Sequence, residues 1–282
     1  MGTSAVEAQP EGRIAIIGGQ GRLPMILARA LQDAGEAPLL AEMQGFPIEG
    51  AEEAEITRFR VERLALFLDH LHEAGVRRVV FAGAMRRPRL EPELFDPRSA
   101  QLVPQLVAAM QGGDDALLRA VVALFQEDGF AVVGADQVAP ALLPAPGVLG
   151  AVAPGPEDER DTERAAEVVA ALGAVDVGQG AVVAQGLCLA VEALPGTDHM
   201  LDVVAQLPRG DGPRGGVFYK APKPGQERRI DLPALGPGTV ERAARAGLSG
   251  VAFEAGGVLL IDRDEMIAAA DAAGLFLWSR AP

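Results

Sequence analysis

Apolar runs of strand length alternate with segments of helical periodicity through the first half of the chain. The run at 14–17 ends in Gly-Gly and leads into a helical pattern over 23–32. The segment 61–75 places apolar residues at 64, 67, 68 and 71, which form one face of a helix. The alternation continues with predicted strands over 37–43, 76–85 and 131–135 and a predicted helix over 114–129. This order predicts an α/β domain with a mostly parallel sheet covered on both faces.

The pattern changes after a segment dense in Pro and Gly between Leu142 and Pro156, which is the best candidate for a domain boundary. A charged helical pattern follows over 157–173. Closely spaced strands are then predicted over 180–186, 187–194, 216–221, 250–256 and 258–262, with helices near 197–207, 239–247 and 262–274. We therefore expect a second α/β domain with a partly antiparallel, mixed sheet. The predicted division is a disordered leader over 1–12, an N-terminal domain over 13–146 and a C-terminal domain over 147–282.

The composition is that of a globular protein, with 49% hydrophobic and 23% charged residues. No uninterrupted apolar run approaches the ~18–20 residues that cross a bilayer, and the N-terminus lacks the basic and apolar parts of a secretory signal. The single cysteine, Cys188, lies in an apolar run and is expected to be a small core residue. One cysteine also excludes an internal disulfide and any multi-cysteine metal site. These features predict a soluble protein of a reducing cytoplasm.

The net charge of −14 disfavours binding to nucleic acid, because an acidic chain without a basic stripe repels a polyanion. The cationic residues are almost all arginine. Only Lys220 and Lys223 are lysines, and the one tyrosine, Tyr219, lies beside them. Lysine is usually a solvated surface residue, but this isolated pair in an arginine-rich chain indicates a chemical role.

The segment IIGGQGRLP at 16–24 is a Gly-rich turn between a predicted strand and a predicted helix, where backbone amides can approach a phosphate or a sugar. Gly19 and Gly21 fit the first two positions of a dinucleotide fingerprint, but Pro24 stands at the third. We interpret the turn as a site for an anionic or nucleotide ligand. A tight connection without a ligand is the alternative, since such turns need glycine in any case. The candidate substrate-binding residues here are Gly18, Gly19, Gln20, Gly21, Leu23 and Pro24.

Two further motifs follow in the first domain. AGAMRRP, at the carboxyl end of a strand of the same sheet, offers Gly83 for close approach and Arg86 or Arg87 as a planar donor to a pyrophosphate. A solvated arginine pair is the alternative. QGGDDALLR places Asp114 and Asp115 where they can cap a helix or hold a sugar hydroxyl.

The second domain contributes two further turns that carry polar candidate residues next to predicted strands. DVGQGAVV places Asp176 and Gln179 before a predicted strand, where they can point toward a ligand. AVEALPGTDHML ends a strand and opens a helix, so Thr197 or Asp198 can serve as an N-cap. Glu192 and Asp198 can also offer the hard oxygen ligands that Mg²⁺ prefers.

The segment 219–240 is the most specific of the candidates. Within it, a stiff run of prolines and glycines carries Lys220, Lys223, Gln226, Glu227, Arg229 and Asp231. A merely solvated loop rarely concentrates cations in an acidic protein. The pattern favours phosphate recognition by Lys and Arg, with Asp231 placed to ligate a metal or to activate a water.

Several common catalytic arrangements are absent from the sequence. His70 and His72 are two residues apart on a predicted helix and face different directions. There is no H-E-x-x-H, no G-x-S-x-G and no Walker motif. Serine and cysteine nucleophile chemistry is therefore disfavoured, which leaves metal chemistry on a phosphate.

In this order and spacing the motifs resemble the LpxI-type UDP-2,3-diacylglucosamine pyrophosphatases, from about Gly12 to the C-terminus. The resemblance rests on IIGGQGRLP, AGAMRRP, GGDDALLRAV, DVGQGAVV, LAVEALPGTDHM, KAPKPGQERRIDLP, GPGTVERAARAGLSGVAFEAG and the ending ADAAGLFLW. One departure is visible, since Glu227 stands where the family pattern prefers Asp.

The resemblance implies Mg²⁺-dependent hydrolysis of UDP-2,3-diacylglucosamine to UMP and 2,3-diacylglucosamine 1-phosphate (lipid X) in lipid A biosynthesis. It also implies a Gram-negative, cytoplasmic enzyme that meets a lipid-linked nucleotide sugar at the inner membrane, with contact to that membrane and a homodimer as further options. The fold it implies is a Rossmann-like N-terminal domain and a distinct C-terminal domain, with the substrate cleft between them.

On this hypothesis Asp231, assisted by Asp198 or Glu192, holds Mg²⁺, and Lys220, Lys223 and Arg229 stabilise charge on the phosphate oxygens. The turn residues listed above and Gln226 bind the substrate. Two alternatives stay open. One is an NAD-binding oxidoreductase built on the first domain, against which Pro24 counts. The other is a non-catalytic nucleotide-sugar or lipid-binding protein, which would bind without releasing UMP.

Overall fold

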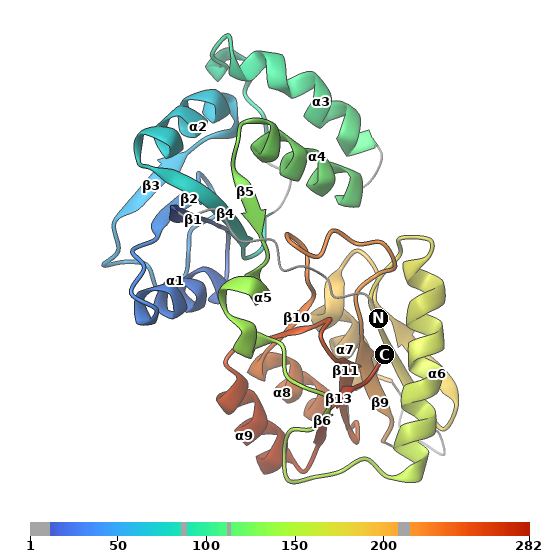
Figure 1. Ribbon diagram of the computed structural model, residues 1–282. Coiled ribbons are helices and arrows are strands. Elements are labelled where there is room, and N and C mark those ends of the chain that lie inside the picture. The colour runs from blue at the N-terminus through green and yellow to red at the C-terminus, as the bar shows by residue number, and fades with distance from the viewer. Residues whose placement is uncertain (1–11, 86–88, 112–113, 208–214) are drawn as a thin grey trace, which may run out of the picture. The chain divides into compact units, whose positions relative to one another are not determined.

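The computed structural model describes residues 12–85, 89–111, 114–207 and 215–282. Its backbone divides into two compact units (Figure 1). Among the described residues, unit 1 holds those up to Pro140 together with Glu227–Asp231, and unit 2 holds those within Ala141–Gln226 and Leu232–Pro282. The predicted leader lies almost wholly outside the described residues. The segment Glu227–Asp231, from the second half of the sequence, thus belongs to unit 1, whose other residues come from the first half.

Within the described part of unit 1, one sheet of five parallel strands has the order β3-β2-β1-β4-β5. The strands are β1 (Arg13–Gly18), β2 (Leu39–Met43), β3 (Ile56–Phe59), β4 (Val76–Ala82) and β5 (Ala131–Val133). The helices are α1 (Leu23–Asp33), α2 (Leu64–Glu73), α3 (Ser99–Gln111), α4 (Asp114–Glu127) and α5 (Ala135–Val138), with 3₁₀ turns at Val61–Arg63 and Pro92–Leu94. Figure 1 shows α2, α3 and α4 on one side of the sheet and α1 on the other. The strand order reverses between β1 and β4, which is where ligands of such sheets bind.

The apolar face predicted for the segment 61–75 is buried as expected. Leu64, Phe67, Leu68 and Leu71 all belong to α2 and are less than a tenth exposed. Leu106 from α3 and residues of α4 complete the same core against β1 and β4. The parallel α/β fold predicted for this half is therefore confirmed.

Unit 2 contains a separate mixed sheet of six described strands in the order β6-β13-β11-β9-β7-β8. These strands are β6 (Gly147–Val148), β7 (Gly180–Ala184), β8 (Leu187–Val191), β9 (Val217–Lys220), β11 (Gly250–Glu254) and β13 (Phe276–Arg280). The helices are α6 (Pro156–Gly173), α7 (Gly196–Ala205), α8 (Pro237–Arg245) and α9 (Arg263–Ala273). A 3₁₀ turn over Pro140–Leu142 includes the last residue of unit 1 before the chain enters unit 2. The strands β10 (Ala234–Leu235) and β12 (Leu259–Leu260) pair with each other outside this sheet. β9, β11 and β13 are parallel, whereas β6, β7 and β8 join in antiparallel pairs, so the prediction of a mixed sheet is confirmed.

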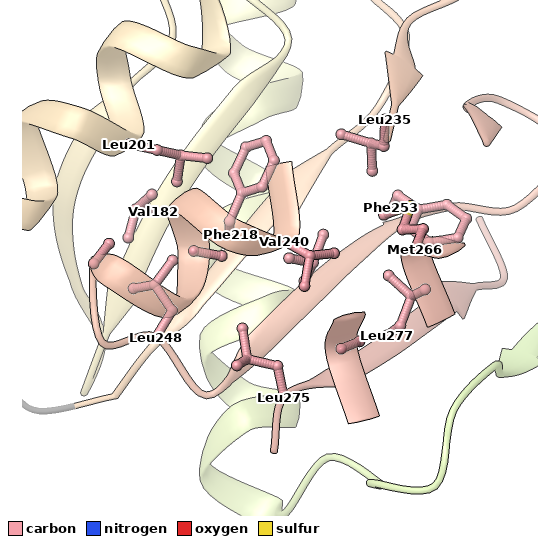
Figure 2. Close-up of a cluster of buried hydrophobic side chains, with 14 of the residues drawn as sticks. Val182, Leu201, Phe218, Leu235, Val240, Leu248, Phe253, Met266, Leu275 and Leu277 are labelled. Carbon is pink, nitrogen blue, oxygen red and sulfur yellow. The ribbon is translucent and has the colours of Figure 1, made fainter. Parts of the chain in front are cut away.

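Each face of the unit 2 sheet has its own core. Figure 2 shows the larger one, in which Val182, Phe218 and Phe253 from the strands meet Leu201 of α7 and Val240 of α8. On the opposite face, α6 packs on alternate residues of the same strands, such as Val217 and Tyr219. The period of two along β9 therefore directs Val217 and Tyr219 to one layer and Phe218 to the other.

Cys188 is exposed, so the prediction that it is a core residue is wrong. The reason is its position on β8, which lies at one edge of the described sheet and is largely exposed. An apolar sequence on an edge strand has the same composition as one in the middle of a sheet, and only the strand order separates the two cases.

A buried carboxylate of α6 holds the turn between β7 and β8. Asp161 is 3% exposed, and its two oxygens accept the backbone N–H groups of Gln185 (2.8 Å) and Gly186 (2.7 Å). Both turn residues have positive φ, at +51° and +78°. Asp161 thus ties the hairpin to the helix layer that covers it.

Replacing Asp161 by Ala is expected to lower the free energy of unfolding of unit 2 by about 2–4 kcal/mol, because two charge-assisted hydrogen bonds are lost. Denaturant unfolding followed by the fluorescence of Trp278, the one tryptophan, reports on this unit. Glu163→Ala on the exposed side of α6 is the control and should change the free energy of unfolding by less than about 0.5 kcal/mol. Equal effects of the two substitutions would contradict this role of Asp161.

None of the described helices is both long and apolar enough to cross a membrane.

Candidate active site

The two glycine turns of unit 1 follow adjacent parallel strands and are bonded to each other. Gly19 N–H donates to the Ala82 carbonyl at 2.8 Å, and Gln20 N–H donates to the Ala84 carbonyl at 2.9 Å. Ala84 N–H returns a bond of 2.9 Å to the Gln20 carbonyl, which makes an antiparallel bridge between the turns. The amides of Gly19 and Gln20 thus already have acceptors in the protein, so they are not arranged as donors to a phosphate.

This contact explains two of the glycines. A Cβ atom on Gly19 would lie 2.5 Å from the Ala84 carbonyl oxygen. A Cβ atom on Gly83 would lie 2.6 Å from the Gln20 carbonyl oxygen, and Gly83 also has φ of +88°. Both positions need glycine for the close approach of the two turns.

The other residues of the first turn divide into packed and open positions. Gly18 lies against Ile48 and Pro24, so that an added Cβ would meet the Ile48 side chain at 2.5 Å. Leu23 begins α1 and is partly exposed, while Pro24 is buried in its first turn. Gly21 has φ of +95° and no atom within 4 Å of an added Cβ. Of these four turn residues, Gly21 and Leu23 keep the access that a ligand needs.

Two other features of this turn region bear on nucleotide binding. Glu42 at the end of β2, where a dinucleotide fold holds a ribose, is 7% exposed. It accepts the Ile48 N–H at 3.0 Å and the Arg58 guanidinium at 3.1 Å, so it is engaged within unit 1. Arg86, the predicted pyrophosphate donor, lies outside the described residues.

The segment Glu227–Asp231, which we name the arm, forms a single helical turn on unit 1. The N–H groups of Ile230 (3.2 Å) and Asp231 (3.0 Å) both donate to the Glu227 carbonyl. The Glu227 carboxylate accepts a two-pronged pair from Arg229 at 2.8 and 2.7 Å. This hydrogen bonding holds the pKa of the Glu227 carboxyl below its usual range and raises the pKa of Arg229. Glu227 is therefore an ionised partner of Arg229.

Asp115 lies next to the arm in unit 1. One of its carboxylate oxygens accepts the Glu227 N–H at 3.3 Å, and the carboxylate also pairs with Arg119 one turn later on α4. Asp114 is the first residue of α4, and its side chain lies outside the described part of the chain. The structure thus connects Asp115 with Glu227, a pairing that the sequence did not predict.

In unit 2, three of the predicted site residues meet in one buried network. The Lys220 ammonium lies 3.2 Å from the Glu192 carboxylate and donates to the Thr197 hydroxyl. Thr197 in turn donates to Glu192 at 3.0 Å. The side chains of Lys220 and Glu192 are only 6% and 10% exposed. Thr197 lies inside the first turn of α7 and bonds to Glu192, so it is not an N-cap.

Lys223, Asp176 and Gln226 form a second, more open group in the same unit. The Lys223 ammonium lies 2.6 Å from the Asp176 carboxylate, with side chains that are 17% and 51% exposed. The Gln226 amide oxygen accepts the Lys223 N–H at 2.8 Å and closes the turn between them. Gln179 accepts the Ala221 N–H with its backbone, while its buried Oε1 has no hydrogen-bond partner among the described residues.

The predicted magnesium ligands are divided between the two units. Asp198 pairs with Arg242 at 3.1 Å and Glu192 with Lys220 at 3.2 Å, both in unit 2, whereas Asp231 belongs to the arm. Across the described residues, no three His, Cys, Asp or Glu side chains gather to hold a metal ion. Glu192 and Asp198 are each engaged with a cation of unit 2. Arg242 and Arg119 are cationic partners of candidate carboxylates that the sequence did not predict. The i, i+4 spacing of Asp115 and Arg119 is a signal for the second of these.

Comparison with known proteins gives two family matches that together cover most of the chain. Residues 13–142 match the family model described as LpxI N-terminal domain, and residues 145–278 match the one described as LpxI C-terminal domain. The chain is also 42% identical over 269 residues to the UDP-2,3-diacylglucosamine pyrophosphatase LpxI of Caulobacter vibrioides. That alignment covers 94% of this chain and 96% of the relative.

Proposed function

The chain belongs to the LpxI family, and from this premise we propose that it hydrolyses the pyrophosphate bond of UDP-2,3-diacylglucosamine in lipid A biosynthesis. The products on this proposal are UMP and 2,3-diacylglucosamine 1-phosphate. The observation that carries it is the identity of 42% with a named pyrophosphatase along nearly the full length of both chains. The resemblance seen in the motifs is thereby confirmed at the level of the family.

Within this reaction we assign the central role to Asp231, which the arm presents at the end of a hydrogen-bonded turn. A carboxylate is a suitable group to orient and deprotonate an attacking water. Lys220, Lys223 and Arg229 are proposed to stabilise the negative charge on the phosphate oxygens. Lys220 suits this role because Glu192 and Thr197 hold its ammonium in one place, so no reorganisation is needed during the reaction.

We also propose that turnover requires Mg²⁺. If the ion binds, Asp231 would be the arm residue that holds it, and it would supply positive charge to the diphosphate oxygens, which are suitable Mg²⁺ ligands. A bound Mg²⁺ neutralises phosphate charge and makes the anhydride easier to attack. The two acyl chains of the substrate lead us to extend the proposal to peripheral contact with the inner membrane.

The direct experiment is UMP release from UDP-2,3-diacylglucosamine by the purified full chain, with Mg²⁺, with EDTA, and with Mg²⁺ restored after EDTA. We expect release that stops with EDTA and returns with the ion. A mock purification from the same host controls for contaminating hydrolases. Binding without UMP release would replace the enzyme by a nucleotide-sugar or lipid-binding protein, and release that EDTA leaves unchanged would remove the metal from the proposal.

A further inference from the structure

The arm takes its position from unit 1, although it is flanked in sequence by residues of unit 2. Glu227–Asp231 belongs to unit 1, while Gln226 before it and Leu232 after it belong to unit 2. The backbone of Asp231, the residue to which the proposed function assigns the reaction, therefore belongs to unit 1 through a segment of five residues.

Contacts of two kinds hold the arm on unit 1. At its first residue, the Glu227 N–H donates to the Asp115 carboxylate at 3.3 Å. Near its other end, Ile230 packs against the hydrophobic core that α2, α3 and α4 form on β1 and β4. Between these points the Glu227–Arg229 pair closes the turn, and the charge of Arg119 on α4 further favours ionised Glu227.

We propose that Asp115 is a positioning residue for Asp231. Its carboxylate accepts the Glu227 N–H, and the Glu227 carbonyl accepts the Asp231 N–H at 3.0 Å, so the two peptide groups that flank the Glu227 Cα connect α4 to the backbone of Asp231. Arg119 holds the Asp115 side chain from the other direction. This inference rests on the proposed function and replaces the role in substrate binding that the sequence suggested for Asp115.

The chemistry of the contact sets an order among variants. Asp115→Asn keeps an oxygen that can accept the Glu227 N–H, but it weakens the pairing with Arg119. Asp115→Ala removes both contacts. A positioning role therefore predicts kcat in the order wild type, Asn, Ala, with Ala lowered roughly ten- to hundredfold, because small displacements of a reacting group cost this much. KM should change little, because a positioning residue does not itself contact the substrate.

The experiment measures kcat and KM together with hydrogen exchange of the peptide that spans 227–231. Asp115→Ala and Ile230→Ala loosen opposite ends of the arm, and both should speed exchange in this peptide and lower kcat. Glu127→Gln, at the exposed far end of α4, removes the same charge as Asp115→Asn and should change neither quantity. Thermal unfolding of each variant shows whether it is folded, and Ile230→Ala keeps the test available if Asp115→Ala is not.

The outcomes separate this inference from the function on which it rests. Faster exchange in the arm with lower kcat and unchanged KM supports it. A raised KM with unchanged exchange would overturn it and return Asp115 to substrate binding. If wild type releases no UMP, the proposed function fails, and faster exchange in the variants would then show only that Asp115 anchors the arm.

Discussion

Replacing Asp231 by Asn is expected to lower kcat by about 10²–10⁴-fold or more, while the fold and the binding of substrate stay intact. Asn has nearly the same shape, but it can neither accept a proton from water at neutral pH nor offer a negative charge. The bond that places residue 231 on the arm comes from its backbone N–H, so the substitution leaves the turn closed. The loss should therefore lie in the reaction and not in the structure.

The measurement is UMP release by Asp231→Asn, with substrate affinity and thermal unfolding recorded on the same preparation. Asp264→Asn, which changes the charge equally at an exposed position of α9, should retain full activity. Full activity of Asp231→Asn would remove Asp231 from the mechanism. An equal loss of affinity and of rate would instead indicate that this carboxylate mainly binds substrate, directly or through a metal.

The sequence predicted the folds of both units where periodicity is strong, and it missed elements whose signals are short. The strand β13 ends the chain with the run from Phe276 to Arg280, which was not predicted as a strand. β3 is only four residues long and partly exposed, so neither alternation nor a continuous apolar run marks it. The helix α3 contains Pro104, a residue that normally argues against a helix interior.

The sequence indicated which residues are candidates for the site, but it did not indicate which of them pair with one another. Lys220 and Glu192 are 28 residues apart in sequence, and Asp115 and Glu227 are 112 apart. No local spacing relates such residues, since strand order and the packing of the arm bring them together. The glycine turns illustrate the same limit, because Gly19 and Gly83 are needed for the approach of two neighbouring turns and not only for an anion.

The two lysines of the chain allow the same substitution to be compared in a buried ion pair and in a more exposed one. Lys220→Met leaves the buried Glu192 carboxylate without its cation, and breaking a buried pair in this way costs about 3–5 kcal/mol. Lys223→Met leaves Asp176 half exposed to water, so its cost should stay below about 1 kcal/mol. Denaturant unfolding followed by Trp278 fluorescence compares the same substitution in both environments.

A double variant then separates the structural role of Lys220 from its chemical one. Lys220→Met with Glu192→Leu removes both charges and leaves apolar side chains of similar size, which is often neutral or even stabilising. We expect near wild-type stability together with a large loss of UMP release, because a fixed cation that stabilises phosphate charge is missing. If the stable double variant keeps full activity, Lys220 serves only the fold of unit 2. If it stays as unstable as Lys220→Met alone, the loss comes from packing around Thr197 and not from an unpaired carboxylate.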